Sequence, residues 1–311
     1  MFIAINVLAA TILFAVPIVI WYIRNKKGQF VHTGDRTLRF SREFLLHLLI
    51  AMFFAFTYLA FAYFHTPWTW FGFLHVYALI ATFILPFALA YLCKGTRAAK
   101  TVAIVLSAIL LLSPITRPLI FWSWGRGPAI TAWEYAIPLN LCNISAIVFI
   151  IAILTNNPIL KNYMIALGMF GGIINNVQIH NTHVNHFWYY FNWESYIVHA
   201  LIIIIPIFML LTNQIKPNWK HAAYGFAILI PVYLLKGFLL NPLWGTNFHF
   251  TYPIAFTRDI LPTMSNPWII FNNPVDPLHM LGMFVLVTAA STLLFLFSTF
   301  LYKKVRPKFM V

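Results

Sequence analysis

Nine apolar runs divide this sequence, and each is about as long as a helix that crosses a membrane. They lie near residues 2–23, 43–63, 71–92, 101–122, 138–155, 162–177, 193–213, 221–241 and 277–302. Of the 311 residues, 61% are hydrophobic and 8% are charged, a composition that excludes a soluble globular domain. The sequence therefore predicts an all-α fold, a polytopic helical membrane protein with about nine transmembrane helices.

The basic residues indicate how these helices are oriented. Lys and Arg total 20, and sixteen of them fall in five segments between alternate runs: 24–42, 94–100, 161, 216–220 and 303–308. Since Lys and Arg are enriched in cytoplasmic loops, we expect the N-terminus outside and the C-terminus inside. The same clustering argues against nucleic-acid binding, which a net charge of +14 alone would suggest. The first run lacks the basic start of a cleaved signal peptide and is interpreted as a retained anchor.

Several residues are interpreted as structural. His47 is expected to pack inside the second run with its ring bonded to a backbone carbonyl. Cys93 lies at the cytoplasmic end of the third run and Cys142 near the outer face, so the two are too far apart for a disulfide. We expect Cys93 to be an inert, small apolar residue. The sixth run is short and contains Gly168, Gly171 and Gly172, which predicts a broken or tightly packed helix.

A polar cluster opens the fifth run. Pro138 suits the first turn of a helix, and Asn140, Cys142 and Asn143 follow it within about one turn. Polar side chains are costly against lipid, so these residues should face the interior of the bundle. Two further amides, Asn175 and Asn176, lie at the outer end of the sixth run.

His199 lies about two turns into the seventh run. At 1.5 Å per helical residue, Cys142 and His199 come out at about 6 and 9 Å below the outer surface. They are thus expected at similar depth on antiparallel helices. An ionisable residue inside a membrane helix is by default a candidate for function.

The outer loops supply further candidates. Arg126 and Arg258 could hold a phosphate head group, because guanidinium suits oxyanions. Asn247 or Asp259, in the long segment 241–276, could orient the histidine, and that segment is interpreted as a lid or re-entrant loop. His75, near the outer end of the third run, could line the same cavity.

A metal site is not expected. His180, His183 and His186 form a pattern that suggests zinc ligands, but helical residues six apart differ by about 240° and cannot converge. Without an adjacent acidic residue or cysteine, unless Glu194 folds back, the three are interpreted as a hydrated interfacial loop.

The segment 138–146, which reads Pro-Leu-Asn-Leu-Cys-Asn-Ile-Ser-Ala, resembles the signature of the YwaF and transmembrane-protein-164 family of integral membrane proteins. The run around His199 and the Leu-Trp-Gly-Thr-Asn segment (243–247) stand where that family has its counterparts. In the bacterial pattern a His and an Asp flank the cysteine, and this sequence departs from it with Asn140 and Asn143. The resemblance implies a seven-helix catalytic core at 73–302, preceded by a two-helix extension with a basic cytoplasmic loop (1–72) and followed by a basic cytoplasmic tail (303–311).

The vertebrate branch of the family is regarded as a phospholipid acyltransferase that uses a cysteine and a histidine, which correspond to Cys142 and His199. The resemblance thus implies an enzyme without a cofactor that moves a fatty acyl chain from a phospholipid to a lipid or lipoprotein acceptor. The chemistry suits the pair, because a histidine can take the proton of a thiol, which then forms an acyl-cysteine near the outer leaflet. Asn140, Asn143, Asn175 or Asn176 could donate hydrogen bonds to the oxyanion.

Two other function classes remain open. A non-enzymatic lipid transporter or scramblase would use the same polar cavity without covalent chemistry. A metal-dependent hydrolase would depend on the histidines at 180–186. The sequence is rich in Phe, Ile, Asn and Lys, which is typical of an AT-rich genome and suggests a bacterial plasma membrane, with the active site facing the extracellular leaflet.

Overall fold

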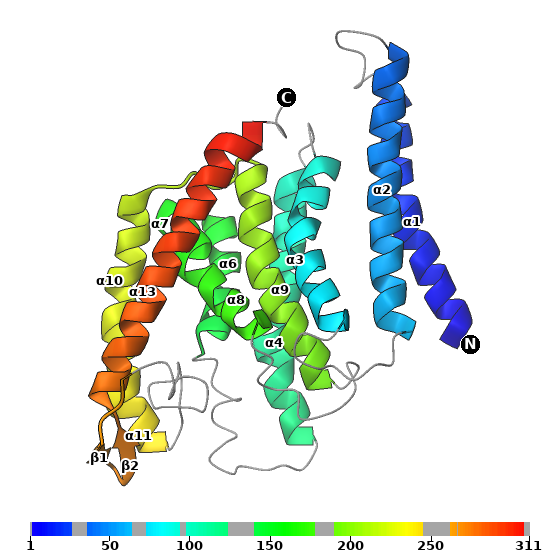
Figure 1. The fold of residues 1–311 in the computed structure, drawn as a ribbon. Helices are drawn as coiled ribbons and strands as arrows, with labels where there is room; N and C mark the ends of the chain where they lie inside the picture. The colour runs from blue at the N-terminus through cyan, green and yellow to red at the C-terminus, as the bar shows by residue number, and fades with distance from the viewer. Residues whose placement is uncertain are drawn as a thin grey trace.

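The computed structural model describes residues 2–26, 36–63, 73–93, 98–123, 140–177, 190–244, 262–265 and 267–307. Nearly all of this is helix (Figure 1). The α-helices are α1 (Phe2–Lys26), α2 (Arg36–Tyr63), α3 (Phe73–Leu92), α4 (Ala98–Ser123), α6 (Leu141–Thr155), α7 (Pro158–Tyr163), α8 (Met169–Val177), α9 (Tyr190–Leu211), α10 (Trp219–Leu235), α11 (Asn241–Trp244) and α13 (Pro277–Phe300). Three π-helical segments continue them: η1 (Met164–Gly168), η2 (Lys236–Leu240) and η4 (Leu301–Val305).

The helices fit a membrane. In the described part of the chain, six helices are long and apolar enough to cross a bilayer, and two shorter apolar helices cover Glu43–Tyr58 and Leu141–Thr155. Each of the nine apolar runs contains helix. Helices are expected there because lipid offers no partners to backbone N–H and C=O groups. The prediction of an all-α, polytopic membrane protein is confirmed. The sequence did not predict the short antiparallel hairpin of β1 (Trp268–Ile270) and β2 (Asn273–Val275) before α13.

The sixth apolar run is both interrupted and tightly packed. α7, η1 and α8 follow one another without a break, and the π-helical turn of η1 separates the two α-helices. A Cβ at Gly168 would lie 2.8 Å from the Phe149 ring, which is closer than carbon atoms can approach. Glycine therefore allows α6 to come against this segment, as small residues do between membrane helices.

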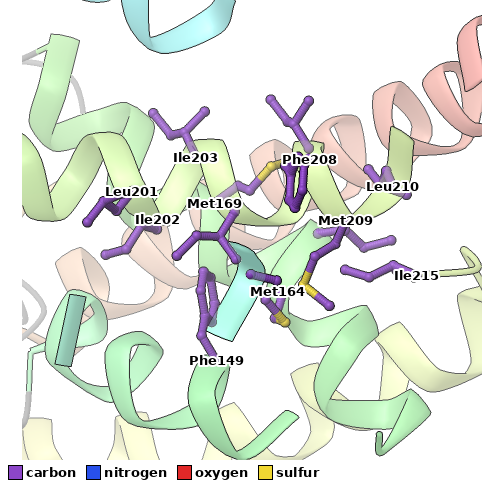
Figure 2. Packing of buried hydrophobic residues seen from close by; sticks show 14 of the residues in the cluster. Phe149, Met164, Met169, Leu201, Ile202, Ile203, Phe208, Met209, Leu210 and Ile215 are labelled. Atoms are coloured by element: carbon purple, nitrogen blue, oxygen red, sulfur yellow. The ribbon is translucent and has the colours of Figure 1, made fainter. Parts of the chain in front are cut away.

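α9 is the central helix of the bundle. Of its window Glu194–Leu211, 94% is buried, whereas the windows on α1, α4, α10 and α13 are between 17% and 25% buried. Figure 2 shows Phe149 of α6 and Met164 of η1 packed among side chains of α9 such as Ile202 and Phe208. The outer helices present apolar side chains outward, including Leu293 of α13, as expected of a surface in contact with lipid.

α1 and α2 pack against each other at one side of the bundle (Figure 1). Polar contacts join this pair to α3: Arg24 donates to the carbonyl of Tyr91 at 3.2 Å, and Thr57 shares a hydrogen bond with the Tyr77 hydroxyl at 2.6 Å. The Tyr91 hydroxyl also donates to the carboxylate of Glu43 in α2. In α2, Nδ1 of the buried His47 donates to the Glu43 carbonyl at 2.7 Å. The prediction that His47 is a packing residue bonded to a backbone carbonyl is confirmed.

The two ends of the bundle differ in charge. η4 and the junctions α6–α7 and α9–α10 lie at one end, whereas α1 begins and α6 starts toward the other (Figure 1). The last turns of α1 and η4 carry Arg24, Lys26, Lys303 and Lys304, all at the first end. We call this the basic end, and the opposite one the hairpin end, because β1 and β2 lie there.

Candidate functional site

Cys142 lies in the first turn of α6, near the hairpin end of the bundle. Asn140 occupies the N-cap position with extended backbone, and its side chain makes no capping bond. The thiol of Cys142 is half-buried and lies 3.9 Å from Oδ1 of the buried Asn143. Of the polar residues in this turn, Asn143 is buried, whereas Asn140 and Cys142 are half-buried.

Two consecutive glycines of α8, Gly171 and Gly172, show at what height along α8 the start of α6 and His199 lie. A Cβ at Gly171 would meet Leu141, the residue before Cys142, at 3.5 Å. A Cβ at Gly172 would lie 2.7 Å from the backbone oxygen of His199. Neighbouring helical residues differ in height by about 1.5 Å. The start of α6 and His199 of α9 therefore contact the same level of α8.

The hydrogen bonds of His199 define its basic nitrogen. Nδ1 lies 2.5 Å from the carbonyl oxygen of Ser195, which can only accept, so Nδ1 carries the proton of the neutral ring. The amide of Asn175 on α8 lies 2.9 Å from the same Nδ1, and a half-turn of that amide presents its oxygen to the ring. Nε2 is then the nitrogen that can take a proton. His199 itself is buried, with 6% of its surface exposed.

A layer of polar contacts surrounds this part of α9. The Ser113 hydroxyl of α4 donates to the buried carboxylate of Glu194. Tyr196 donates to the Ala78 carbonyl of α3 and lies 2.6 Å from the Thr82 hydroxyl. These bonds hold the turn before His199 from two sides, so the orientation of His199 is fixed by its neighbours.

α3 and α8 are joined in the same layer. The buried His75 bonds to the backbone oxygen of Asn176 at 2.7 Å. The side-chain amide of Asn176 is 2% exposed and forms no hydrogen bond with any residue that the structure describes. His75 thus contacts the residue of α8 that follows Asn175, and Asn175 is the partner of His199.

Lys236 brings a positive charge toward Cys142. It is the first residue of η2, and only 2% of its surface is exposed. A thiolate at Cys142 of α6 and the ammonium of Lys236 of η2 lie close enough to attract each other. Tyr163 of α7 is also within electrostatic range of Cys142, and its hydroxyl lies 3.0 Å from Ser145, one turn further along α6. A nearby cation favours the thiolate form of a cysteine, which is the nucleophilic form.

The other cysteine has a different environment. Cys93 follows α3 at the basic end, is 8% exposed and packs in the main apolar cluster. Burial raises the pKa of its thiol. Neither Cys93 nor Cys142 is part of a disulfide in the structure.

The structure describes some of the predicted site residues and not others. Cys142, His199, Asn140, Asn143, Asn175 and Asn176 are placed as given above. Seven residues lie outside the described residues: Arg126, Arg258, Asn247, Asp259, His180, His183 and His186. In the ranges that are described, no group of three His, Cys, Asp or Glu side chains could hold a metal ion.

Sequence reasoning missed Lys236 and the hydrogen bonds of Glu194 and Tyr196. Lys236 interrupts the eighth apolar run and is an ionisable residue inside a membrane helix. That interruption is a signal for function. The partners of Glu194 and Tyr196 come from α4 and α3 and could not be identified from local sequence.

Comparison with known protein families gives a match over most of the chain. The model of the TMEM164 family matches residues 68–302, which is most of the chain. Neither curated proteins nor solved structures give a match. The matched region contains the turn of Cys142, the glycines of α8 and the histidine of α9. The chain therefore belongs to the TMEM164 family.

Proposed function

We propose that this protein is a membrane-embedded acyltransferase that moves a fatty acyl chain from a phospholipid to a lipid or lipoprotein acceptor through an acyl-cysteine at Cys142. One observation carries the proposal: Leu141, which precedes the nucleophile Cys142, and the backbone of the base His199 lie against consecutive glycines of α8, at one height in the bundle. Buried ionisable groups in membrane helices are costly and are kept where they serve a function.

The first half of the reaction consumes the donor. The Cys142 thiol gives its proton to Nε2 of His199, and the thiolate attacks the ester carbonyl of the phospholipid. The tetrahedral oxyanion then collapses, the bond to the glycerol oxygen breaks, and that oxygen takes the proton from His199. The products are a lysophospholipid and a thioester on Cys142.

The second half regenerates the cysteine. The hydroxyl or amine of the acceptor gives its proton to His199 and attacks the thioester carbonyl. The carbon–sulfur bond breaks, the acyl chain stays on the acceptor, and the proton returns to the Cys142 sulfur. Lys236 stabilises the thiolate in both halves.

Two amides, Asn143 and Asn176, are proposed to donate to the oxyanion. Asn143 is buried beside the thiol, and the amide of Asn176 has no hydrogen-bond partner among the described residues. A donor aimed at the oxyanion typically contributes about 10²- to 10³-fold in rate. Arg126 and Arg258, together with the loop of Asn247 and Asp259, are proposed to hold the phosphate head group and to cover the site.

The same proposal includes the topology. The chain crosses the membrane about nine times with the basic end in the cytoplasm. The site then faces the outer leaflet, in a bacterial plasma membrane. α1 and α2 form an extension that precedes a seven-helix catalytic core.

The test is a transfer assay on the full chain in vesicles that contain a phospholipid with a labelled acyl chain and an unlabelled acceptor. We expect label on the acceptor with wild type and with Cys93→Ala, and none above background with Cys142→Ala. The assay also records lipid movement between leaflets. Movement that persists in Cys142→Ala, with no transfer by wild type, would overturn the proposal and favour the transporter or scramblase.

A further inference from the structure

The basic end of the bundle holds a cavity of about 650 Å³ that the proposed acyl transfer does not use. It lies where the α6–α7 junction meets the α9–α10 loop and the start of α4, at the opposite end of α6 from Cys142 (Figure 1). Its volume is in the range of cavities that bind small molecules, about 300–1,000 Å³. The space is therefore large enough for a phosphate ester or a lipid head group.

The charge of the lining has one sign. Lys100, Lys161, Lys216 and His221 line the cavity, and none of the lining residues that the structure describes is Asp or Glu. The pKa of Lys161 is lowered, first by burial and then by the positive charge of Lys100. Lys100 and Lys161 thus repel each other, and an anion between them would relieve that repulsion.

Hydrogen bonds between distant segments hold the lining in place. Lys161 donates from Nζ to the Gln214 carbonyl at 2.7 Å and to the side chain of Asn156. Asn162 is 1% exposed; its Oδ1 accepts from the Asn218 amide at 2.7 Å, and its Nδ2 donates to the Lys216 carbonyl at 3.3 Å. A loop that served only to carry topology-determining charges would not need such bonds.

Further groups that suit an anion face the same space. α10 is 17 residues long and begins at this cavity, where the positive end of its dipole lies. The buried Nδ1 of His221, in its first turn, makes no hydrogen bond to any residue that the structure describes. Arg306, just beyond η4, donates to Asn213 of the lining at 2.6 Å.

We propose that this lysine cavity is a second binding site, which takes a phosphate-bearing anion at the basic end of the bundle. The recognised chemistry is a phosphate ester, which three lysines and a helix start can surround. That phosphate comes either from the head group of an anionic lipid or from a soluble phosphate ester. The site is separate from Cys142 and does not depend on the acyl-transfer proposal.

The experiment has two arms, one for each source. In the first, the full chain in phosphatidylcholine nanodiscs is titrated with glycerol 3-phosphate, and binding is followed by thermal unfolding. In the second, the detergent-purified chain is offered an equal mixture of phosphatidylglycerol and phosphatidylcholine, and retained lipid is counted by native mass spectrometry. We expect wild type to bind in at least one arm, and the responding arm identifies the source.

The variants separate the cavity from general positive charge. The triple variant K100Q/K161Q/K216Q should lose about tenfold or more in affinity. The triple variant K220Q/K303Q/K304Q removes the same charge from exposed lysines of the same end, outside the lining, and should stay within about twofold of wild type. Because K161Q also removes the bonds to Asn156 and Gln214, K100Q/K216Q is measured as well and should lose affinity with the fold intact.

Two results would overturn the proposal. The first is that wild type binds in neither arm. The second is that the control triple loses as much affinity as the cavity triple, which would mean that the anion responds to the net charge of the surface.

Discussion

The bundle has two polar regions, and they accommodate polar groups in a membrane protein in opposite ways. Around His199 the polar side chains are buried, and hydrogen bonds join α9 to α3, α4 and α8. In the lysine cavity the charges gather in the open at the basic end, beside a hydrogen-bonded loop. The first arrangement suits proton transfer away from water, and the second suits an ion that arrives from water.

The largest expected difference is between two of the buried histidines, His199 and His47. In both His199 and His47, Nδ1 bonds to the backbone carbonyl four residues earlier. If the region around His199 is catalytic, His199→Ala should slow acylation of Cys142 by about 10²- to 10⁴-fold, because a general base is lost. His47→Ala is the matched control and should leave the rate unchanged. Rates are measured by rapid quench and intact mass, and equal effects of the two variants would contradict the assignment of His199.

The next prediction concerns the close approach of α8 and α9. In Gly172→Ala the new Cβ would meet the backbone oxygen of His199 at 2.7 Å, and backbone cannot move aside cheaply. We expect a loss of about 1–3 kcal/mol in the free energy of unfolding, together with slower acylation. In Gly171→Ala the nearest atoms are at 3.5 Å, an ordinary contact, so this variant should unfold like wild type. Thermal or denaturant unfolding in detergent measures the stability of both variants. A free energy of unfolding unchanged in Gly172→Ala would show that α8 and α9 do not pack closely at Gly172.

Lys236 offers a smaller effect at the same site. Lys236→Met removes the cation that favours the Cys142 thiolate, so alkylation of Cys142 by iodoacetamide should slow by about tenfold near neutral pH. Lys236→Arg keeps the charge and should restore most of the rate, which a purely steric role would not do. Alkylation is counted by peptide mass spectrometry, with Lys220→Met as the control on the same helix. Equal alkylation rates in wild type and Lys236→Met would show that Lys236 does not influence the reactivity of Cys142.

The smallest expected effect is a pH dependence of the lysine cavity. The pKa of Lys161 is lowered from 10.5 by burial and by Lys100, so Lys161 loses its charge at lower pH than an ordinary lysine. The affinity for a phosphate ester should therefore fall as pH rises toward 10.5. Lys100, Lys216 and His221 face the same cavity, so Lys161→Arg is needed to isolate Lys161. Arg stays charged, and the fall should be weaker in that variant; an identical pH curve would exclude Lys161 as its source.

Sequence predicted the helices well because a bilayer allows few alternatives to them. It could not predict which helix is central. α9 and α13 have nearly equal mean hydropathy, 2.1 and 2.3, yet 94% of one window and 22% of the other is buried. Lipid is as apolar as a protein core, so composition does not separate buried helices from lipid-facing ones. The layer around His199 depends on that arrangement.

The candidate site was predictable in part for the same reason. Cys142 and His199 stand out as reactive residues at matching heights in apolar runs, and height follows from counting residues. The pairing of Asn175 with His199 requires the side-by-side packing of α8 and α9, which Gly172 permits. The lysine cavity joins segments more than 50 residues apart, so from sequence its lysines indicated only topology.

Formation of an acyl adduct on Cys142 tests the central claim most directly. The purified full chain is incubated with phospholipid, and intact mass and peptide mapping locate any added acyl chain. We predict one hydroxylamine-sensitive adduct on Cys142 in wild type and in Cys93→Ala, and none in Cys142→Ala. An adduct on Cys93 instead, or none in any lipid mixture that supports acyl transfer, would contradict a covalent mechanism at Cys142.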